Sequence, residues 1–390
     1  MNFAIDILED LKEKSLYRTL KDSVVSGARI SVDGCDFLNF ASNDYLGISN
    51  NINWQKEFLE ENSSKNTFLM SSVASRLLAG NNVAYSSLES LIASTYNKYT
   101  QDDCELECLV FNSGYHANTG ILPALSGAKD LIIADKQVHA SLIDSLSLTK
   151  AKWLRFKHND YENLEAILEK NRANFENVFI VTEALFSMDA DTADIAKLVE
   201  LKQKYSCYLY VDEAHSIGIF GEDGLGLCAK LGLLDEVDFV MATLGKALAS
   251  EGAFLLCKKE FKELLINKCR SFIFTTAIAP LNILWSEFVF KKLFSMQKER
   301  AKLAEFSKLI KAEIPQANGE MHIISIVLGE SELAMNMQKK LIDKNIYAPA
   351  IRYPSVAKGR AMLRLSLSGA MQLSDIQEFI KSFKECLGQL

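Results

Sequence analysis

Two stretches of the sequence decide the fold: YLYVDEAHSIGIFGEDGLGL at residues 208–227 and DFVMATLGKALASEGAFLL at residues 238–256. Both contain apolar runs typical of buried strands, and polar residues follow directly where these runs end. Open α/β sheets bind ligands at the carboxyl ends of their strands. The acid Asp212, the imidazole His215 and the amine Lys246 are therefore expected at one edge of a sheet. Such a set suits a cofactor that needs a carboxylate on one side and a covalent lysine on the other.

Two other interpretations of these letters are weaker. The letters DEAH at residues 212–215 also occur in helicases, but those enzymes need a phosphate loop of the form GxxxxGK followed by Ser or Thr. Around Lys246 this pattern fails, because Val240 and Ala247 occupy the positions of the first glycine and of the Ser or Thr. A dinucleotide-binding loop is loosely indicated by four glycines: Gly218, Gly221, Gly224 and Gly226. These glycines follow DEAH instead of leading from a strand into a helix, so ordinary turns explain them.

Composition places the chain among ordinary globular proteins, with 390 residues of which 48% are hydrophobic and 24% charged. The net charge of −7 argues against a nucleic-acid groove, which needs clustered Lys and Arg. The N-terminus lacks the basic-then-apolar order of a signal peptide, and no apolar run approaches the roughly 20 residues of a membrane span. Eight cysteines without a C-x-x-C pair indicate reduced thiols and no metal site. We expect a cytoplasmic protein that binds neither nucleic acid nor membrane.

The first 125 residues alternate between periodic segments and turn signals. Apolar residues at helical spacing predict a helix up to about Asp22, and Asp33 with Gly34 predicts a hairpin turn. The elements expected next are strands at 29–32 and 35–40, loops at 39–49 and 71–82, a helix at 83–99, a strand at 106–111 and a helix at 117–125.

Beyond residue 125, apolar runs alternate with helical patterns, which predicts an α/β fold whose large domain has a mostly parallel sheet sandwiched by helices. The strands are expected near 130–134, 152–156, 177–182, 207–212, 238–243 and 252–257. After Pro280 the pattern changes to that of a smaller C-terminal α+β domain. Its elements are expected as a long amphipathic segment at 281–313, a strand at 322–328, a helix at 331–344, strands at 346–352 and 362–368, and a helix at 373–387. The expected parts are an N-terminal helix and hairpin at 1–45, a large domain at 46–285 and a small domain at 286–390.

Polar residues at or just beyond the predicted strand ends form the candidate site. They are Gly114, Tyr115, His139, Glu183, Ser187, Asp212, His215, Thr243 and Lys246. Singly, each has an ordinary structural explanation, and the glycine loop at 112–116 is by itself better explained as a simple turn than as a phosphate cradle. Together, in this order, they match what pyridoxal phosphate (PLP) requires: a lysine for a covalent bond, a carboxylate at the pyridine nitrogen and a phosphate nest.

Nine motifs resemble the α-oxoamine synthases, which are PLP-dependent enzymes of fold type I. The motifs are NFASNDYLG (39–47), ASRLLAGN (74–81), FNSGYHAN (111–118), DKQVHASLIDS (135–145), TEALFSMDAD (182–191), VDEAHSIGIFGEDGLG (211–226), ATLGKAL (242–248), FIFTTA (272–277) and IRYPSVAKG (351–359). The resemblance implies an acyltransferase that condenses an amino acid with an acyl thioester. It also implies a homodimer with the active site at the interface, where Thr275 and Thr276 reach the cofactor of the neighbouring subunit.

The resemblance assigns roles to the candidate cofactor residues. Lys246 would bind PLP covalently and then transfer protons, while Asp212 would pair with the ring nitrogen. His215 would contact the ring 3′-oxygen, and His139 would stack on the ring. Ser187 would form a hydrogen bond near the cofactor. Thr243 and the backbone of Gly114 and Tyr115 would hold the phosphate.

Substrate residues are also implied by the resemblance. Arg352 would bind the amino-acid carboxylate, and Arg18, Asn43 and Glu183 would shape the pocket. The segment SRLLAG at 75–80 favours a member that condenses L-alanine with a pimeloyl thioester, carried by CoA or by acyl carrier protein, because glycine-using relatives tend to have SRxICGT there. A glycine-using relative such as glycine C-acetyltransferase is the alternative. A catalytically inactive partner subunit is a further alternative, which the presence of a lysine at the strand end argues against.

Five positions depart from the pattern of the family. Ser71 and Val73 stand in place of two glycines, Tyr85 of a histidine, Ala357 of a proline and Met362 of an arginine. Val73 is expected to alter the local backbone or the acyl channel, because a branched side chain reaches positive φ only at a cost. None of the five is Lys246 or Asp212, so we expect them to affect which acyl substrate is bound and not the PLP chemistry.

Overall fold

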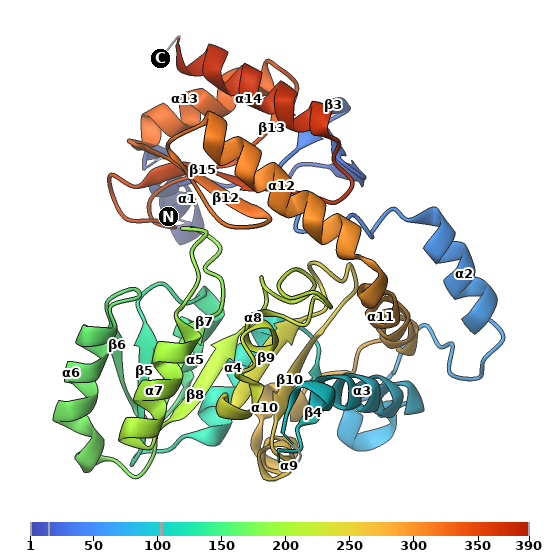
Figure 1. Cartoon of the computed structure of the whole chain (residues 1–390), viewed down its shortest axis with the longest axis vertical. Helices are drawn as coiled ribbons and strands as arrows, with labels where there is room; N and C mark the ends of the chain where they lie inside the picture. The colour runs from blue at the N-terminus through green and yellow to red at the C-terminus, as the bar shows by residue number, and fades with distance from the viewer. Residues whose placement is uncertain (1, 15, 102–103, 389–390) are drawn as a thin grey trace.

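The computed structural model of the chain describes residues 2–14, 16–101 and 104–388. Its centre is a seven-stranded sheet with the order β4-β10-β9-β8-β7-β5-β6 (Figure 1). Strands β6, β5, β7, β8 and β9 are parallel, and β10 runs antiparallel to both of its neighbours. The bounds are β4 Glu107–Phe111, β5 Leu131–Asp135, β6 Lys152–Phe156, β7 Val178–Glu183, β8 Tyr208–Asp212, β9 Phe239–Thr243 and β10 Ala253–Cys257. The predicted fold class is confirmed, and each of these strands lies within one residue of its expected bounds.

Helices flank this sheet and bury its apolar runs (Figure 1). Helix α4 packs on α5 and on β9 and β10, and its first turn is capped by the Ser113 hydroxyl, which accepts from the His116 N–H. In the described part of the chain no helix is both long and apolar enough to cross a membrane. The helices are α2 Ile52–Asn62, α3 Val83–Tyr96, α4 Gly114–Leu125, α5 Ala140–Leu148, α6 Tyr161–Asn171, α7 Ile195–Tyr205, α8 Leu227–Lys230, α9 Lys259–Lys268, α10 Arg270–Ile273 and α11 Pro280–Lys292.

The C-terminal residues form an antiparallel sheet with the order β11-β12-β15-β14, on which helices pack. Its elements are α12 Gln297–Glu313, β11 Ala317–Asn318, β12 Ile323–Gly329, α13 Ser331–Ile342, β14 Ala350–Ile351, β15 Ala361–Ser366 and α14 Leu373–Leu387. The expected single strand at 346–352 is wrong. It is divided into β13 Ile346–Tyr347, which pairs with β3, and β14, which pairs with β15. Pro349 lies between them and has no N–H to continue a ladder.

The expected continuous segment at 281–313 is also divided. Helix α11 ends at Lys292, a 3₁₀ turn follows at Leu293–Ser295, and α12 begins at Gln297. The buried guanidinium of Arg300 donates to the Leu293 carbonyl at 3.1 Å and to the Glu222 carbonyl. The Arg300 side chain therefore binds the Leu293 carbonyl, which an uninterrupted α-helix would have used for a backbone hydrogen bond.

The N-terminal segment joins the C-terminal part of the fold. Strands β1 Ser23–Ser26, β2 Arg29–Val32 and β3 Cys35–Asn39 form a sheet with β13. The hairpin at Asp33 and Gly34 is confirmed, with φ values of 52° and 82°. The helix expected up to Asp22 is wrong, because α1 spans only Phe3–Glu13. None of its residues is buried, so no tertiary packing extends it. The boundaries at 45/46 and 285/286 stay predictions.

Two of the departing residues have clear structural settings. Val73 takes a φ of 47° although its side chain is branched, so the left-handed turn forms without glycine. A short π-helix at Arg76–Gly80 follows inside the expected loop. The buried Tyr85 hydroxyl donates to the Ile278 carbonyl at 3.0 Å, and the Arg76 guanidinium lies 4.2 Å from the centre of its ring.

Candidate active site

Four neighbouring strands of the central sheet end in polar side chains at the same edge. Strand β5 ends at Asp135, β7 at Glu183, β8 at Asp212 and β9 at Thr243. Glu183 and Asp212 are register partners on adjacent parallel strands, so their carboxylates leave the sheet side by side. Lys246 lies in the turn after β9. The parallel topology thus collects an amine and several acids in one place.

A cavity of about 150 Å³ lies at this edge. It is lined by residues that follow β4, β5, β7, β8 and β9, together with the start of α4. Eight of the residues that the sequence singled out are among them. The lining residues are Gly114, Tyr115, Asn118, His139, Ser141, Glu183, Asp212, Ala214, His215, Met241, Thr243 and Lys246.

Lys246 is held by a buried histidine. Its Nζ lies 2.8 Å from Nε2 of His215, and Nδ1 of His215 lies 2.8 Å from the hydroxyl of Tyr45. Burial lowers the pKa of Lys246, an effect that the nearby Asp212 and Glu183 oppose. Burial and the charge of Lys246 hold the pKa of His215 well below its ordinary value. The imidazole is therefore neutral, and the amine loses its proton more readily than a lysine in water.

Asp212 is oriented by two donors. Its Oδ2 accepts from Asn118 Nδ2 at 2.8 Å, and its Oδ1 accepts from the Ala214 N–H at 2.9 Å. Asn118 is held in turn by the Tyr210 hydroxyl, which donates to its Oδ1 at 2.7 Å. These bonds fix the direction in which the carboxylate faces the cavity.

His139 and Glu183 form the opposite wall. The backbone N–H of His139 donates to Oε1 of Glu183 at 2.5 Å, and Nδ1 of His139 lies 2.8 Å from the Ser141 hydroxyl. Burial lowers the pKa of His139. Burial and the neighbouring Asp212 raise the pKa of Glu183 well above its ordinary value. This wall therefore carries less charge at neutral pH than its residue types suggest.

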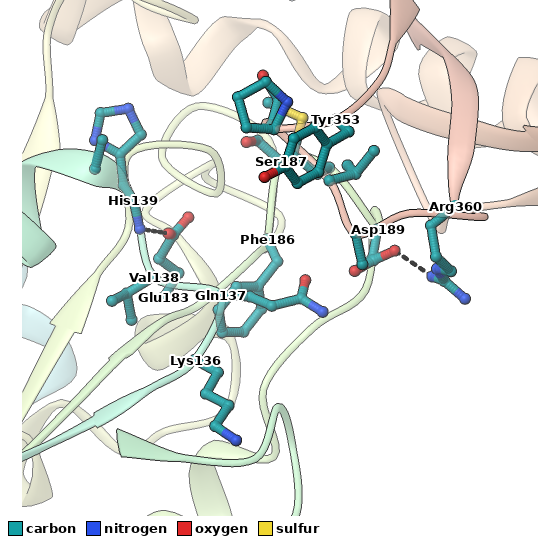
Figure 2. A pocket seen from close by; sticks show the side chains of 16 residues that line it. Lys136, Gln137, Val138, His139, Glu183, Phe186, Ser187, Asp189, Tyr353 and Arg360 are labelled. Carbon is teal, nitrogen blue, oxygen red and sulfur yellow. Dashed lines mark hydrogen bonds and ion pairs between the residues drawn. The ribbon is translucent and has the colours of Figure 1, made fainter. Parts of the chain in front are cut away.

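A larger cavity of about 560 Å³ shares His139 and Glu183 with the first one (Figure 2). The large domain contributes the loops that follow β5 and β7, and Ser187 lies in the second loop. Residues 353–357 and Arg360 of the C-terminal part complete the lining. The carboxylate of Asp189 pairs with Arg360 across the cavity rim, at 2.5 Å (Figure 2).

The other predicted residues lie apart from the lysine. Arg18 and Arg352 line a third cavity of about 280 Å³, which shares residues 353–355 with the second. Thr275 and Thr276 are contacted by Asn112, whose Nδ2 donates to the Thr276 carbonyl at 2.7 Å. Within one subunit they do not line the lysine cavity.

Asn43 belongs to a cluster behind His215. Its Oδ1 accepts from the Tyr45 hydroxyl at 2.9 Å and from Nη1 of Arg364 at 3.4 Å. Nη2 of Arg364 also lies 3.4 Å from the Tyr45 hydroxyl, and Nε donates to the Ser187 carbonyl at 2.9 Å. Arg364 therefore connects the C-terminal sheet to both the histidine cluster and the Ser187 loop.

Comparison with known proteins is consistent with this geometry. Residues 35–383 match the family described as aminotransferase class I and II. The chain belongs to that family. It is 42% identical to a protein of Haemophilus influenzae (strain KW20), and the match covers 95% of this chain and 97% of the other. It is also 42% identical to a protein of Pasteurella multocida (strain Pm70), with 97% of each chain covered. Both carry the provisional name 8-amino-7-oxononanoate synthase.

Solved structures of family members superpose on the chain. Serine palmitoyltransferase of Sphingomonas wittichii gives a TM-score of 0.88 at 25% identity, covering 100% of this chain and 97% of the other. An 8-amino-7-oxononanoate synthase of Francisella tularensis gives 0.73 at 26% identity, covering 90% and 98%. A serine palmitoyltransferase of S. paucimobilis was solved with PLP bound. It gives a TM-score of 0.87 at 25% identity, covering 100% of this chain and 98% of the other. The expected membership of the α-oxoamine synthases, PLP-dependent acyltransferases within the family, is confirmed.

The residues of the lysine cavity fit PLP. They offer an amine, an oriented carboxylate and the N-terminus of the 12-residue helix α4, whose N–H groups suit a phosphate. A Cβ added to Gly114 would lie 3.8 Å from Met241 and 3.9 Å from Thr243, both of which line the cavity. A side chain here would therefore occupy space in the cavity.

Three residues of the site were missed by the sequence interpretation: Tyr45, Asn118 and Arg364. Tyr45 and Asn118 fall inside motifs at 39–47 and 111–118, where they resemble ordinary core residues. Arg364 had a clearer signal in the sequence, because it is the one charged residue in the apolar run AMLRLSL at 361–367, which contains the described strand β15. In the structure its side chain is only 8% exposed. A buried arginine in a strand needs partners, and partners of this kind often form a site.

Proposed function

We propose that the chain catalyses the decarboxylative condensation of L-alanine with a pimeloyl thioester, which gives 8-amino-7-oxononanoate, CO2 and the free thiol carrier in biotin biosynthesis. The observation that carries the proposal is a pair of joined cavities. The 150 Å³ cavity holds the lysine, and the 560 Å³ cavity shares His139 and Glu183 with it. The first fits PLP and the second has room for an acyl chain. The names of the 42%-identical relatives support the same reaction.

When bound, PLP supplies an electron sink that stabilises negative charge at the substrate Cα. Asp212 holds a proton on the ring nitrogen, since two unit charges about 4 Å apart at an effective dielectric near 20 interact by roughly 4 kcal/mol. That energy corresponds to about three pK units. His139 would cover the ring, His215 would contact its 3′-oxygen, and Ser187 would add a hydrogen bond nearby. The N–H groups of Gly114 and Tyr115 would hold the phosphate together with the Thr243 hydroxyl, which donates to the Gly252 carbonyl in this structure at 3.0 Å.

Lys246 has two tasks in this proposal. Its lowered pKa makes the neutral amine available as a nucleophile toward the cofactor. After the amino acid has taken the place of the lysine, the freed amine would take the proton from Cα and later return it. His215 keeps the amine in place through the 2.8 Å contact. A histidine with a pKa held well below its ordinary value suits this position, because it adds no second positive charge.

The larger cavity would take the acyl group. Apolar side chains make up much of its wall, and each methylene buried against them contributes about 0.8 kcal/mol. These apolar residues are Val138, Phe186, Met188, Pro354, Val356 and Ala357. Ala357, one of the departures from the family pattern, therefore lies in the acyl wall. Lys136 also lines the cavity and suits the second carboxyl group of a pimeloyl chain.

The amino-acid carboxylate has two candidate partners. Arg352 is the residue implied by the family resemblance, but it lines the third cavity with Arg18. Arg364 lies closer to the lysine, within the cluster of Tyr45 and His215. Two of its hydrogen bonds are long, at 3.4 Å, and a carboxylate could replace them at better geometry. We therefore propose Arg364 for this role, and Arg18, Asn43 and Arg352 for the surrounding substrate pocket.

A homodimer is proposed from the exposed apolar side chains near Thr275 and Thr276. Monomeric proteins rarely leave such groups uncovered in one patch. The exposed members are Met70 at 69%, Val73 at 85%, Leu78 at 82%, Val83 at 67% and Phe274 at 71%. A second copy of the chain would cover them and bring the two threonines to its cofactor.

Light scattering of the purified holoenzyme checks the assembly. We expect a mass of twice the 43.6 kDa chain. Phe274→Asp should shift the protein toward the monomer, because a charge cannot be buried unpaired in an apolar interface. A monomeric wild type would contradict the proposed homodimer.

The Asp212→Asn variant tests the ring partner. It should retain PLP but lose activity by about a thousandfold, since the neutral amide forgoes roughly 4 kcal/mol of stabilisation of the protonated ring. Steady-state kcat and the visible absorbance of the holoenzyme measure the two effects. Activity within tenfold of wild type would show that this carboxylate is not the partner.

Replacing each arginine by lysine separates the two carboxylate candidates. Arg364→Lys should raise KM for L-alanine by about tenfold or more, because lysine cannot make the paired bonds of a guanidinium. Arg352→Lys should change this KM less. The reverse order would return the role to Arg352.

The choice between alanine and glycine chemistry is decided by kcat/KM. L-alanine with a pimeloyl thioester should be turned over far faster than glycine with acetyl-CoA. One methyl group discriminates by only about 1–3 kcal/mol, so most of the preference should come from the acyl chain. A higher kcat/KM for glycine with acetyl-CoA would replace the proposed reaction by that of glycine C-acetyltransferase.

A further inference from the structure

Two loops of the large domain form one side of the acyl cavity (Figure 2). The first, residues 136–140, follows β5 and carries His139. The second, residues 184–192, follows β7 and carries Ser187 and Asp189. Loops are the most mobile parts of a fold unless something holds them. The positions of His139 and Ser187 therefore depend on what fixes these two loops.

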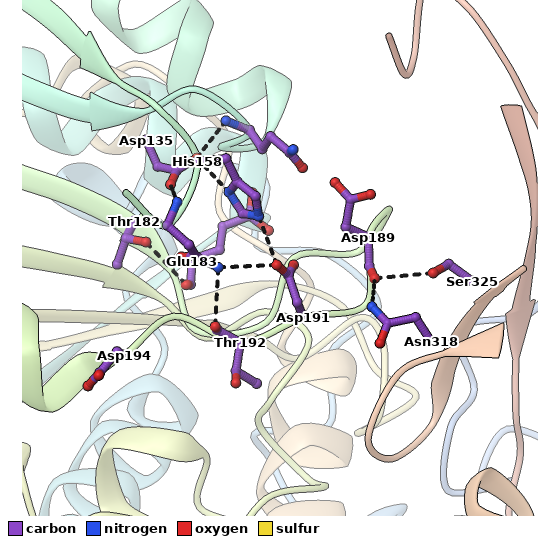
Figure 3. A network of polar contacts seen from close by, with 12 residues as sticks. Asp135, His158, Thr182, Glu183, Asp189, Asp191, Thr192, Asp194, Asn318 and Ser325 are labelled. Carbon is purple, nitrogen blue, oxygen red and sulfur yellow. Dashed lines mark hydrogen bonds and ion pairs between the residues drawn. The ribbon is translucent and has the colours of Figure 1, made fainter. Parts of the chain in front are cut away.

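His158 lies between the bases of both loops (Figure 3). Its Nδ1 is 3.0 Å from Oδ1 of Asp135, at the end of β5, and its Nε2 is 2.9 Å from Oδ2 of Asp191. An ionised carboxylate can only accept a hydrogen bond, so both ring nitrogens must carry a proton. The geometry thus makes His158 an imidazolium that bridges two carboxylates.

The protonation follows from a balance of effects. Burial of the half-buried ring would lower the pKa of His158, but its hydrogen bonds to Asp135 and Asp191 outweigh burial and raise the pKa to about 10. Burial raises the pKa of Tyr161, which also interacts with Asp135 and Asp191, to about 12, and burial raises the pKa of Glu183, which interacts with Asp135. Neither supplies a competing positive charge.

The same two aspartates are tied into the loops, Asp135 through its carboxylate and Asp191 through its main-chain carbonyl. Oδ1 of Asp135 also accepts from the Gln137 N–H at 2.7 Å, two residues before His139. The Asp191 carbonyl accepts from the Phe186 N–H at 2.9 Å. The His158 ring meets the Phe186 ring edge-on at 4.5 Å between centres. The imidazolium therefore restrains both loops, together with the adjacent Asn159, whose N–H donates to Oδ2 of Asp135 at 2.9 Å and whose Nδ2 donates to Oδ2 of Asp191 at 3.1 Å.

The far end of the second loop is anchored to the C-terminal sheet. The Asp189 carbonyl accepts from Asn318 Nδ2 at 2.9 Å and from the Ser325 hydroxyl at 3.1 Å (Figure 3). Its carboxylate pairs with Arg360. The loop is thus held at its tip by the C-terminal part and at its base by His158.

We propose that His158 is a positioning residue for the acyl cavity: as an imidazolium bridging Asp135 and Asp191, it holds the loops that carry His139 and Ser187 in their binding positions. The proposal rests on the proposed function in that the cavity is taken to receive the acyl thioester. Without the positive charge, two carboxylates would face each other across the gap and push the loops apart. Lys246 and Asp212 lie outside this cluster and keep their positions.

His158→Gln in the holoenzyme tests the proposal, because glutamine carries no charge and has its donors on a single nitrogen, so it cannot replace the two ring nitrogens that face different carboxylates. Hydrogen–deuterium exchange should become faster at 136–140 and 184–192, and KM for the acyl thioester should rise on the order of tenfold. KM for L-alanine should change less than KM for the thioester, because Lys246 and Asp212 lie outside both loops. Lys202→Gln is the matched control, since it removes a similarly buried ion pair, Lys202 with Asp238 at 2.9 Å, from the opposite edge of the sheet.

The pH dependence of stability gives a second readout. Because the pKa of His158 is raised from 6.5 to about 10, its contribution is present in full below pH 6.5 and is lost as the pH rises through about 10. The difference in Tm between wild type and His158→Gln should therefore be largest near pH 6, above the range in which carboxylates take up protons, and disappear above pH 10.

The outcomes separate the two proposals. Unchanged exchange in both loops, or a drop in Tm with KM for the thioester unchanged as in the control, would overturn the positioning role. If wild type fails to turn over the pimeloyl thioester, the proposed reaction fails, while the exchange result still decides the role of His158. Should His158→Gln fail to fold, Asp191→Asn removes only the more exposed carboxylate and must speed exchange at 184–192; unchanged exchange there would contradict the proposal.

Discussion

The structure depends on the burial of one amine beside two carboxylates at the carboxyl edge of a parallel sheet. Glu183 and Asp212 leave adjacent strands in register, and Lys246 follows the next strand. Removing such charges from water is costly unless each has partners. Each of the three groups has such a partner: Asn118 for Asp212, the backbone N–H of His139 for Glu183, and His215 for Lys246. The cost of this burial appears as the lowered pKa of Lys246, which is the property that imine chemistry needs.

The site is shared between two parts of the fold. The central sheet supplies the lysine cavity, while β15 supplies Arg364 and residues 353–357 close the larger cavity. Arg364 contacts the Ser187 carbonyl, and Asp189 contacts Asn318 and Ser325. The loop after β7 therefore connects the two parts beside the two cavities that share His139 and Glu183.

The sequence was sufficient to predict the central sheet because buried parallel strands are near-continuous apolar runs with sharp polar ends. The sequence predicted the helix and strand boundaries less well where tertiary contacts determine them. Helix α1 ends at Glu13 and buries none of its residues, so tertiary packing does not lengthen it, and Pro349 divides one expected strand between two sheets. Val73 adopts a positive φ that its side chain disfavours, which shows that neighbouring contacts outweigh local preference.

The candidate site shows the same division. Residues at strand ends, such as Asp212 and Lys246, could be placed from the sequence because topology alone brings them together. Tyr45 and Arg364 come from distant segments, 170 and 149 residues from His215 in the chain. No local pattern could show that they meet behind that histidine. Arg352 was assigned by motif resemblance, and motif position does not tell which cavity a long side chain lines.

The central claim is that Lys246 is the amine that binds the cofactor. Borohydride reduction of the PLP-loaded enzyme followed by peptide mapping tests this most directly, because it fixes the cofactor to whichever lysine holds it. The account predicts a single labelled peptide containing Lys246, and loss of the label and of the visible absorbance in Lys246→Ala. A label on any other lysine, with the absorbance retained in that variant, would contradict the account.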